Sequence, residues 1–204
     1  MTDFLISASI TLVILLSILS HSTADLVDID GNPILNGGHY YIIPITTTAS
    51  TSGLTYTEKE DIDDVCPLYI TKETTENSPG TPVKISSEAR TLHISLDEPV
   101  SLTFQAFASC LNLLAWDITF DPLGRKVYIT AGGDQSSMDK YPFSIIKKDN
   151  SLASIYELKY GTGTNVVLYE DDGLLGLIFT PNSTMVSFKK TEYFLELPTT
   201  SKIQ

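Results

Sequence analysis

Short strand-like runs separated by turn residues are the feature that most limits the fold of this 204-residue chain. Glycine, proline, asparagine and aspartate, which favour tight turns, lie between these runs. Only the amino-terminal apolar run could form a long helix. The sequence therefore predicts an all-β domain of about a dozen strands, arranged as a closed barrel or a sandwich. The expected strands are residues 40–45, 68–70, 92–96, 100–104, 115–120, 127–129, 143–146, 156–160, 166–169, 174–179, 186–188 and 193–197.

The amino-terminal run, residues 4–19, is almost entirely apolar and is followed by the small-residue sequence Ser22-Thr23-Ala24. This order is typical of a secretory signal peptide and its cleavage site, although Asp3 rather than a basic residue precedes the run. A membrane-spanning helix needs roughly 20 apolar residues, and this run has about 16. We therefore expect residues 1–24 to be a signal peptide and residues 25–204 to be one mature domain, secreted to the cell exterior or the vacuole.

The mature chain is strongly acidic. It keeps 24 of the 25 acidic side chains against 13 basic ones, a net charge near −11 with neutral histidines. Such a surface repels nucleic acids and anionic membranes, so neither is an expected partner. Two acidic clusters, residues 61–64 and 170–172, lie in turn-like sequence and are interpreted as solvated loops. The Thr-Ser stretch 46–52 is likewise expected to be a surface loop.

Two interpretations compete for the acidic start of the mature chain. Asp28, Asp30 and Asn32 fall at alternate positions, as ligands do in a calcium-binding loop. An EF-hand loop also needs glycine at its sixth position and glutamate at its twelfth, but Pro33 and His39 occupy those places. The segment is therefore better explained as a turn-rich lead into a β structure, and no metal site is expected.

Few residues in the sequence suggest an enzyme. The mature chain has only His39 and His93 as histidines, no Gly-x-Ser-x-Gly elbow, no redox Cys-x-x-Cys and no phosphate-binding loop. A hydrolase built on two carboxylates remains open at this stage, because a pair such as Asp117 and Asp121 could meet in space. We expect a protein that is not an enzyme and has no cofactor.

A longer pattern lies between residues 26 and 42 and reads aliphatic-x-Asp-x-Asp-Gly-Asn-x-aliphatic, five residues, then Tyr-x-aliphatic. It resembles the signature of the plant Kunitz-type (soybean trypsin inhibitor) family, and every position of that signature is met. The resemblance continues through Cys66-Pro67-Leu68, residues 85–87, residues 99–104, Trp116 and Met138-Asp139. It implies a β-trefoil, with twelve strands in three similar units. Because the sequence shows no internal repeat, the threefold expectation comes from the resemblance alone.

The mature chain has two cysteines, Cys66 and Cys110, and an even count in a secreted chain most simply means that they pair. They match the first disulfide of the Kunitz family. A loop of roughly 44 residues closed in this way stabilises the fold by about 4 kcal/mol on the chain-entropy model. Many members of the family have a second disulfide, whose places fall near Gly161 and Asp172 here, so rigidity near Asp171 is in question.

The segment around Arg90 has the pattern of an exposed extended loop. Apolar and polar residues alternate in residues 83–85 before it and in residues 92–96 after it, so both arms are predicted to be extended and half-buried. The small and polar residues between them are expected to bow outward. A lone cation on such a segment is what a trypsin-like protease selects, since the cation can enter a pocket with a carboxylate at its base.

The resemblance gives this loop a role. In the family, eleven residues separate an Ile-Ser-Ser sequence from a proline, and the third of them precedes the bond presented to the protease. Residues 88–98 fill this interval, so Arg90 and Thr91 would form the reactive site, flanked by Glu88, Ala89 and Leu92. The family also holds its loop with an asparagine before Gly-Gly, and Asn36 occupies that place.

The function expected from the resemblance is a secreted, monomeric inhibitor of a trypsin-like serine protease. The alternative is a β-trefoil protein of seed storage, defence or ligand binding that has lost inhibition, and Glu88 and Thr91 are the residues that favour it. Asn182-Ser183-Thr184 is the only N-glycosylation sequon in the chain. We expect Asn182 to be exposed in a turn, and the sequence leaves open whether it carries a glycan.

Overall fold

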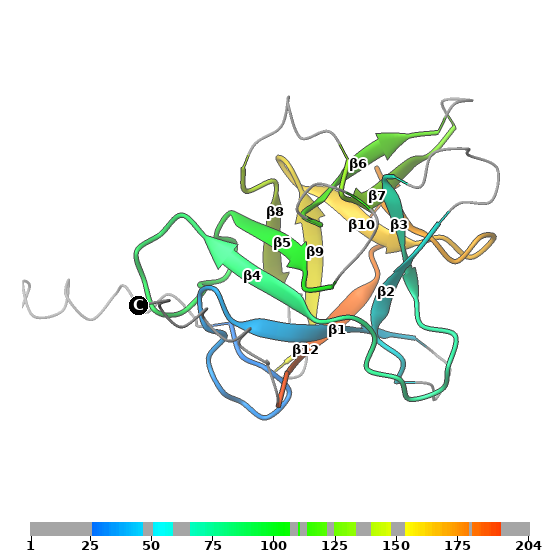
Figure 1. Ribbon diagram of the computed structural model, residues 1–204. Coiled ribbons are helices and arrows are strands. Elements are labelled where there is room, and N and C mark those ends of the chain that lie inside the picture. Colours follow the sequence, from blue (N-terminus) through cyan, green and yellow to red (C-terminus); the bar gives the residue numbers. More distant parts are fainter. Residues whose placement is uncertain are drawn as a thin grey trace, which may run out of the picture.

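The computed structural model describes residues 26–46, 51–58, 66–106, 110, 114–121, 125–133, 140–147, 154–179 and 181–192. Within these residues the chain forms twelve strands and no helix, which confirms the all-β prediction (Figure 1). The strands are β1 (His39–Ile45), β2 (Leu54–Thr57), β3 (Leu68–Lys72), β4 (Val83–Ser87), β5 (Val100–Phe104), β6 (Trp116–Phe120), β7 (Val127–Ala131), β8 (Phe143–Lys147), β9 (Tyr156–Tyr160), β10 (Thr164–Leu168), β11 (Leu175–Ile178) and β12 (Met185–Lys190).

Several sequence predictions fall outside the described residues. These are the signal peptide at residues 1–24, the acidic stretch 61–64, the Met138-Asp139 pair and the expected strand 193–197. Among the residues that are described, no helix is long and apolar enough to cross a bilayer.

Strands β1, β4, β5, β8, β9 and β12 form a closed barrel. Each pairs antiparallel with the next in this order, and β12 pairs with both β9 and β1, which completes the ring. The remaining strands form the hairpins β2–β3, β6–β7 and β10–β11. These hairpins are joined through β7, which pairs with both β3 and β11. They gather at one end of the barrel, toward the right of Figure 1.

The strand order shows three similar units: β1–β4, β5–β8 and β9–β12. In each unit the first and fourth strands belong to the barrel, and the second and third form a hairpin. The predicted β-trefoil is therefore confirmed. The symmetry lies in the backbone and not in recurring side chains, because each barrel position only has to be apolar and of suitable volume.

Alternating burial along the barrel strands builds the core. In β1, for example, Tyr40 and Ile42 are fully buried while their neighbours are half-buried. Aromatic rings extend the core toward the hairpins, because Trp116 packs against Phe104 and Phe143 with ring centroids 5.2 Å and 6.1 Å apart. Each large apolar side chain buried in this way stabilises the fold by roughly 1.5–3 kcal/mol.

Two strand predictions were wrong. Residues 92–96 form no strand, because they meet the amino-terminal segment through isolated bridges and then turn at Asp97, whose φ is 60°. Conversely, β2 was not predicted, and β4 was predicted only as an extended arm over residues 83–85. The Leu-Thr-Tyr-Thr sequence of β2 does alternate, but it follows the Thr-Ser stretch 46–52 that was interpreted as a surface loop. At the end of that stretch Ser52 is buried and donates a hydrogen bond to the Thr75 carbonyl (2.9 Å).

The acidic cluster 170–172 is not simply a solvated loop. Lys126 Nζ lies 2.7 Å from an Asp171 carboxylate oxygen and 2.6 Å from Asp172 Oδ2, which also accepts the Tyr128 hydroxyl hydrogen at 3.0 Å. Burial alone would raise the pKa of Asp172, but hydrogen bonds from Lys126, the Leu174 N–H and Tyr128 together lower it. Burial and Asp172 raise the pKa of Tyr128 to about 12. A polar network thus joins the β10–β11 turn to β7. This turn contains Asp172, near one of the two places where many family members have a second disulfide.

Candidate functional site

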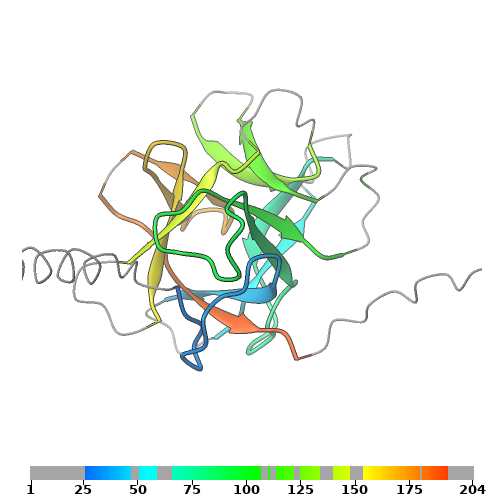
Figure 2. The ribbon, with the colours of Figure 1, turned by 90° about the vertical axis from the view of Figure 1, so that its left-hand side faces the viewer.

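The connection between β4 and β5 is an exposed loop. It projects at the end opposite to the three hairpins and faces the viewer as the green loop of Figure 2. Residues 88–92 are five consecutive exposed positions. Leu92 is 71% exposed, whereas Ile94 is fully buried. The predicted half-buried arm therefore begins later than expected, because the chain bends at Leu92 and breaks the alternation.

The side chain of Asn36 spans this loop from beneath. Its Nδ2 donates to the Ala89 carbonyl at 2.9 Å and to the Thr91 carbonyl at 3.3 Å, with a longer contact of 3.4 Å to the Ser87 carbonyl. Its Oδ1 accepts the Ser87 N–H at 2.9 Å. One amide therefore holds the carbonyl groups on both sides of Arg90. Because an amide nitrogen has only two hydrogens, the two shorter contacts are the main hydrogen bonds.

The backbone around Asn36 adds a second set of restraints. The Asn36 N–H donates to the Leu92 carbonyl at 2.9 Å, and the Gly37 N–H donates to the Ile85 carbonyl at 2.7 Å. Deeper in the structure the Ile94 N–H donates to the Ile34 carbonyl at 2.9 Å. The amino-terminal segment is thus wedged between the two arms of the loop and fixes the distance between them.

The two glycines after Asn36 are required by this geometry. Gly37 has a φ of 81°, which lies in the left-handed region that favours glycine. A Cβ atom on Gly38 would lie 2.8 Å from a ring carbon of Tyr40 and 3.0 Å from the Leu35 carbonyl oxygen. The Asn-Gly-Gly sequence therefore turns the chain tightly enough to present the Asn36 side chain to the loop.

The side chains at the top of the loop are free to meet a partner. Glu88, Ala89, Arg90 and Thr91 are all exposed. The Arg90 guanidinium makes no hydrogen bond or ion pair with any residue that the structure describes. The result is an extended, restrained backbone with one unpaired arginine, which suits a substrate-like contact with a pocket that holds a carboxylate.

Two polar residues at the base of the loop, Ser87 and Glu98, were not identified as functional from the sequence. The Ser87 hydroxyl contacts Glu98 Oε1 and also accepts the Ala89 N–H at 3.0 Å. Glu98 Oε2 accepts the Ser95 N–H at 2.8 Å. No local pattern identifies this arrangement, because the β4–β5 connection alone brings together side chains that are eleven positions apart.

The structure shows what the acidic residues considered for other chemistries do in the fold. Asp28, considered as a calcium ligand, is buried and caps a turn by accepting the N–H groups of Asp30 (3.0 Å) and Asn32 (2.9 Å). Asp117 lies in β6 and Asp121 directly follows this strand, so their Cα atoms are about 13 Å apart along an extended chain. Burial raises the pKa of Asp117, and its carboxylate accepts the adjacent Ile118 N–H at 2.7 Å.

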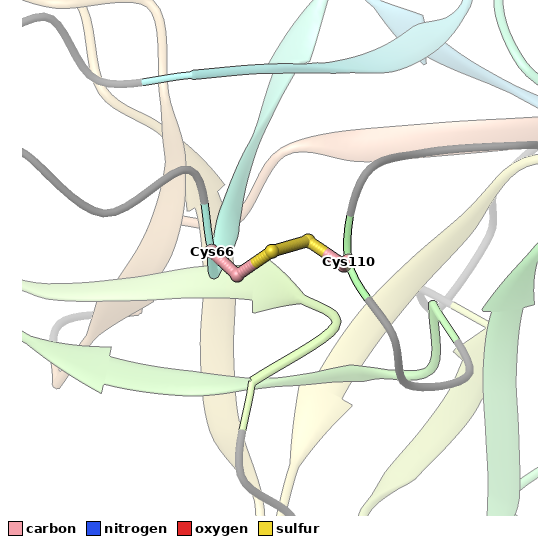
Figure 3. Close-up of a disulfide and its surroundings, with 2 residues drawn as sticks. All are labelled: Cys66 and Cys110. Carbon is pink, nitrogen blue, oxygen red and sulfur yellow. A yellow bond between two sulfur atoms is a disulfide. The ribbon is translucent and has the colours of Figure 1, made fainter.

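Cys66 and Cys110 form a disulfide, with their Cα atoms 5.8 Å apart (Figure 3). The bond joins the segment just before β3 to the connection between β5 and β6. Arg90 lies between the two cysteines in sequence. The disulfide therefore links the parts of the chain on either side of the exposed loop.

The exposed Asn182 lies far from this loop. The register of β1 with β12 places Ile45 opposite Met185 at one end of β1, and Tyr40 opposite Lys190 at the other. Asn182 precedes Met185, whereas the Asn36 turn leads into the opposite end of the same strand. The seven residues of β1 therefore separate Asn182 from the Asn36 turn by about 20 Å.

Comparison with known proteins agrees with this architecture. The legume Kunitz family model, described as trypsin and protease inhibitor, matches residues 26–190. Trypsin inhibitor 2 of Psophocarpus tetragonolobus is 32% identical over 180 residues, covering 82% of this chain and 97% of that protein. Soybean trypsin inhibitor in a complex with porcine pancreatic trypsin has a TM-score of 0.62 at 26% identity, covering 81% of this chain and 98% of that one.

The same fold also occurs in the water-soluble chlorophyll protein of Brassica oleracea, solved with chlorophyll b. Its TM-score is 0.66 at 23% identity, covering 82% of this chain and 99% of that one, a likeness of fold alone. The match to the family model spans most of the sequence, and it includes both the Asn36 turn and the 88–98 loop. The chain therefore belongs to the legume Kunitz family of trypsin and protease inhibitors.

Proposed function

We propose that this protein is a secreted inhibitor of trypsin-like serine proteases, with Arg90 immediately before the bond presented to the enzyme. The observation that carries the proposal is the Asn36 amide, which holds the carbonyls on both sides of Arg90 in an exposed, extended loop. Membership in a family of protease inhibitors, which are not themselves enzymes, supports it. The disulfide is consistent with the secretory route that the amino-terminal sequence predicts.

In this proposal the loop binds as a substrate does. The Arg90 guanidinium enters the pocket of the protease and pairs with its carboxylate, which places the Arg90 carbonyl carbon before the nucleophile. The protease can then cut between Arg90 and Thr91. The Asn36 side chain contacts Ala89 on one side of the cut and Thr91 on the other, so the new amine stays beside the acyl group and can reform the bond.

The disulfide keeps the two parts of the chain covalently joined after the protease has cut the reactive loop. Because the bond after Arg90 lies inside the loop closed by Cys66 and Cys110, cutting it does not separate the chain into two molecules. Glu88 should weaken binding to the protease, because its negative charge lies close to the acidic pocket that receives Arg90.

Limited proteolysis tests which bond the loop presents. Catalytic amounts of trypsin should produce one new amino terminus, at Thr91, and two fragments that separate only after reduction. The intact and cut forms should reach a stable ratio rather than proceed to full digestion. A first new terminus at another lysine or arginine, or continuous degradation, would move the reactive site elsewhere or remove it.

Asn36→Ala should leave the protein folded and speed cleavage after Arg90 by about tenfold. It removes the hydrogen bond from the Ser87 N–H and the two to the carbonyls on either side of Arg90, and the latter two alone are worth roughly 1–3 kcal/mol. Trypsin binding should weaken by a similar factor. The rate of appearance of the Thr91 terminus and the inhibition constant measure these effects. Asn32→Ala, in the other turn of the same segment, is the matched control and should change neither. If Asn36→Ala also changed neither, Asn36 would be a turn residue only.

A glycan on Asn182 should leave inhibition unchanged, because the attachment site lies about 20 Å from the Asn36 turn along β1. Protein from its native source should lose mass on glycosidase treatment, while its inhibition constant for trypsin stays within about twofold. An unchanged mass would show that the sequon is unused. A large gain of inhibition on deglycosylation would show that this placement of the loop relative to Asn182 is wrong.

A further inference from the structure

The carboxylate of Glu98 closes the base of the 88–98 loop from its carboxyl-terminal side. One oxygen contacts the Ser87 hydroxyl, at the start of the loop, and the other accepts the Ser95 N–H at 2.8 Å. The Glu98 N–H also donates to the Ser95 carbonyl at 3.4 Å. A single side chain therefore joins the strand that enters the loop to the segment that leaves it.

The direction of the hydrogen bonds follows from the groups involved. An ionised carboxylate can only accept, and the Ala89 N–H can only donate. The Ser87 hydroxyl therefore donates its hydrogen to Glu98 and accepts the Ala89 N–H at 3.0 Å. This chain of two hydrogen bonds carries the negative charge of Glu98 to the peptide N–H of the residue before Arg90, and charge-assisted hydrogen bonds are stronger than neutral ones.

Asn36 and Glu98 act on the same residue from opposite sides. The Ala89 carbonyl accepts from Asn36 at 2.9 Å, and the Ala89 N–H donates to Ser87, which is fixed by Glu98. Both polar groups of this peptide residue are thus restrained, although its side chain is exposed. We propose that Glu98 is a second positioning residue of the inhibitory loop, acting through Ser87 to fix the backbone next to Arg90. This inference rests on the proposed function.

Hydrogen exchange in the free protein tests the positioning itself, with no protease present. Glu98→Gln removes the charge, and Ser87→Ala removes the link to Ala89 while leaving the Glu98 contact with Ser95. Each should speed exchange of the Ala89 amide hydrogen by about tenfold, the effect of losing one hydrogen bond to a charged network. The double variant should be no faster than the faster single variant, because both changes break one chain of contacts. Unchanged Ala89 exchange in both single variants would overturn the proposal.

Asp97→Asn is the matched control, because it removes a charge next to Glu98 from an exposed side chain. It should leave Ala89 exchange and trypsin inhibition unchanged. Glu98→Gln and Ser87→Ala should each speed cleavage after Arg90 by about tenfold, with melting temperatures within about 4 °C of the wild type. Glu98→Asp keeps the carboxylate. Exchange and cleavage rates between those of the wild type and Glu98→Gln would therefore identify the carboxylate as the group that restrains the loop.

The two experiments separate the possible failures. If the wild-type protein did not inhibit trypsin, the proposed function would fall, and the exchange data would still decide whether Glu98 fixes Ala89. If Ala89 exchange rose while the cleavage rate of the Arg90–Thr91 bond stayed at the wild-type value, Glu98 would not be a positioning residue for inhibition.

Discussion

Replacing Arg90 by alanine should weaken trypsin binding by at least about thirtyfold. Interfaces of this kind concentrate their binding energy in a few central side chains, whose truncation costs roughly 2 kcal/mol or more. A buried guanidinium–carboxylate pair is such a contact, and each 1.4 kcal/mol changes affinity by about tenfold. Because Arg90 bonds to no described residue of its own chain, the fold should not change. The inhibition constant for trypsin, with circular dichroism as a check on folding, measures the effect.

Three variants sharpen this test. Arg125→Ala removes the other arginine of the chain, which is also exposed, and should leave inhibition unchanged. Arg90→Lys keeps a cation and should retain most of the binding. Arg90→Leu should shift preference toward a chymotrypsin-like enzyme with an apolar pocket. Equal trypsin inhibition by the wild type and Arg90→Ala would show that another segment, or no segment, is the reactive site.

Replacing both cysteines by serine should lower the free energy of unfolding by about 4 kcal/mol, because the disulfide closes a loop with a sequence separation of 44 residues. Urea denaturation should show this as a lower midpoint with a somewhat steeper slope, because the unfolded chain without the cross-link exposes more surface. The reduced wild-type protein should behave like the double variant. A loss below about 1 kcal/mol would mean that the Cys66–Cys110 bond restrains the unfolded chain little.

The double-serine variant makes a second prediction about inhibition. Once trypsin cuts after Arg90, no covalent bond joins the two parts of the chain, so fragments should separate in denaturant without a reducing agent. In the wild type the same fragments should separate only after reduction. This comparison tests the topological role of the disulfide independently of its effect on stability.

The sequence predicted the parts of the fold and site that depend on local pattern. Alternating apolar runs identified most of the barrel strands, and the Asn36-Gly37-Gly38 sequence identified a tight turn that only small residues can form. The barrel closure and the three units could not be derived from periodicity. They depend on pairings between distant strands, such as β1 with β12, and were expected only from the family resemblance.

The missed features have the same cause. Glu98 and Ser87 meet through a loop, and Lys126 meets Asp171 and Asp172 through the pairing of β7 with β11, so no short window of sequence contains either network. The burial pattern after Arg90 was mispredicted because the bend at Leu92 depends on its bond to the Asn36 backbone. Side chains that are positioned by long-range contacts need the tertiary structure to be recognised.

Titration of trypsin with the purified protein tests the central claim most directly. The enzyme's active sites are counted first, and residual activity is then measured after incubation with increasing amounts of the protein. Our account predicts loss of activity in proportion to added protein, reaching completion near one molecule per active site, with Arg90→Ala far less effective at equal concentration. Full trypsin activity at a large excess of folded wild-type protein would contradict it and favour a non-inhibitory β-trefoil of storage, defence or ligand binding.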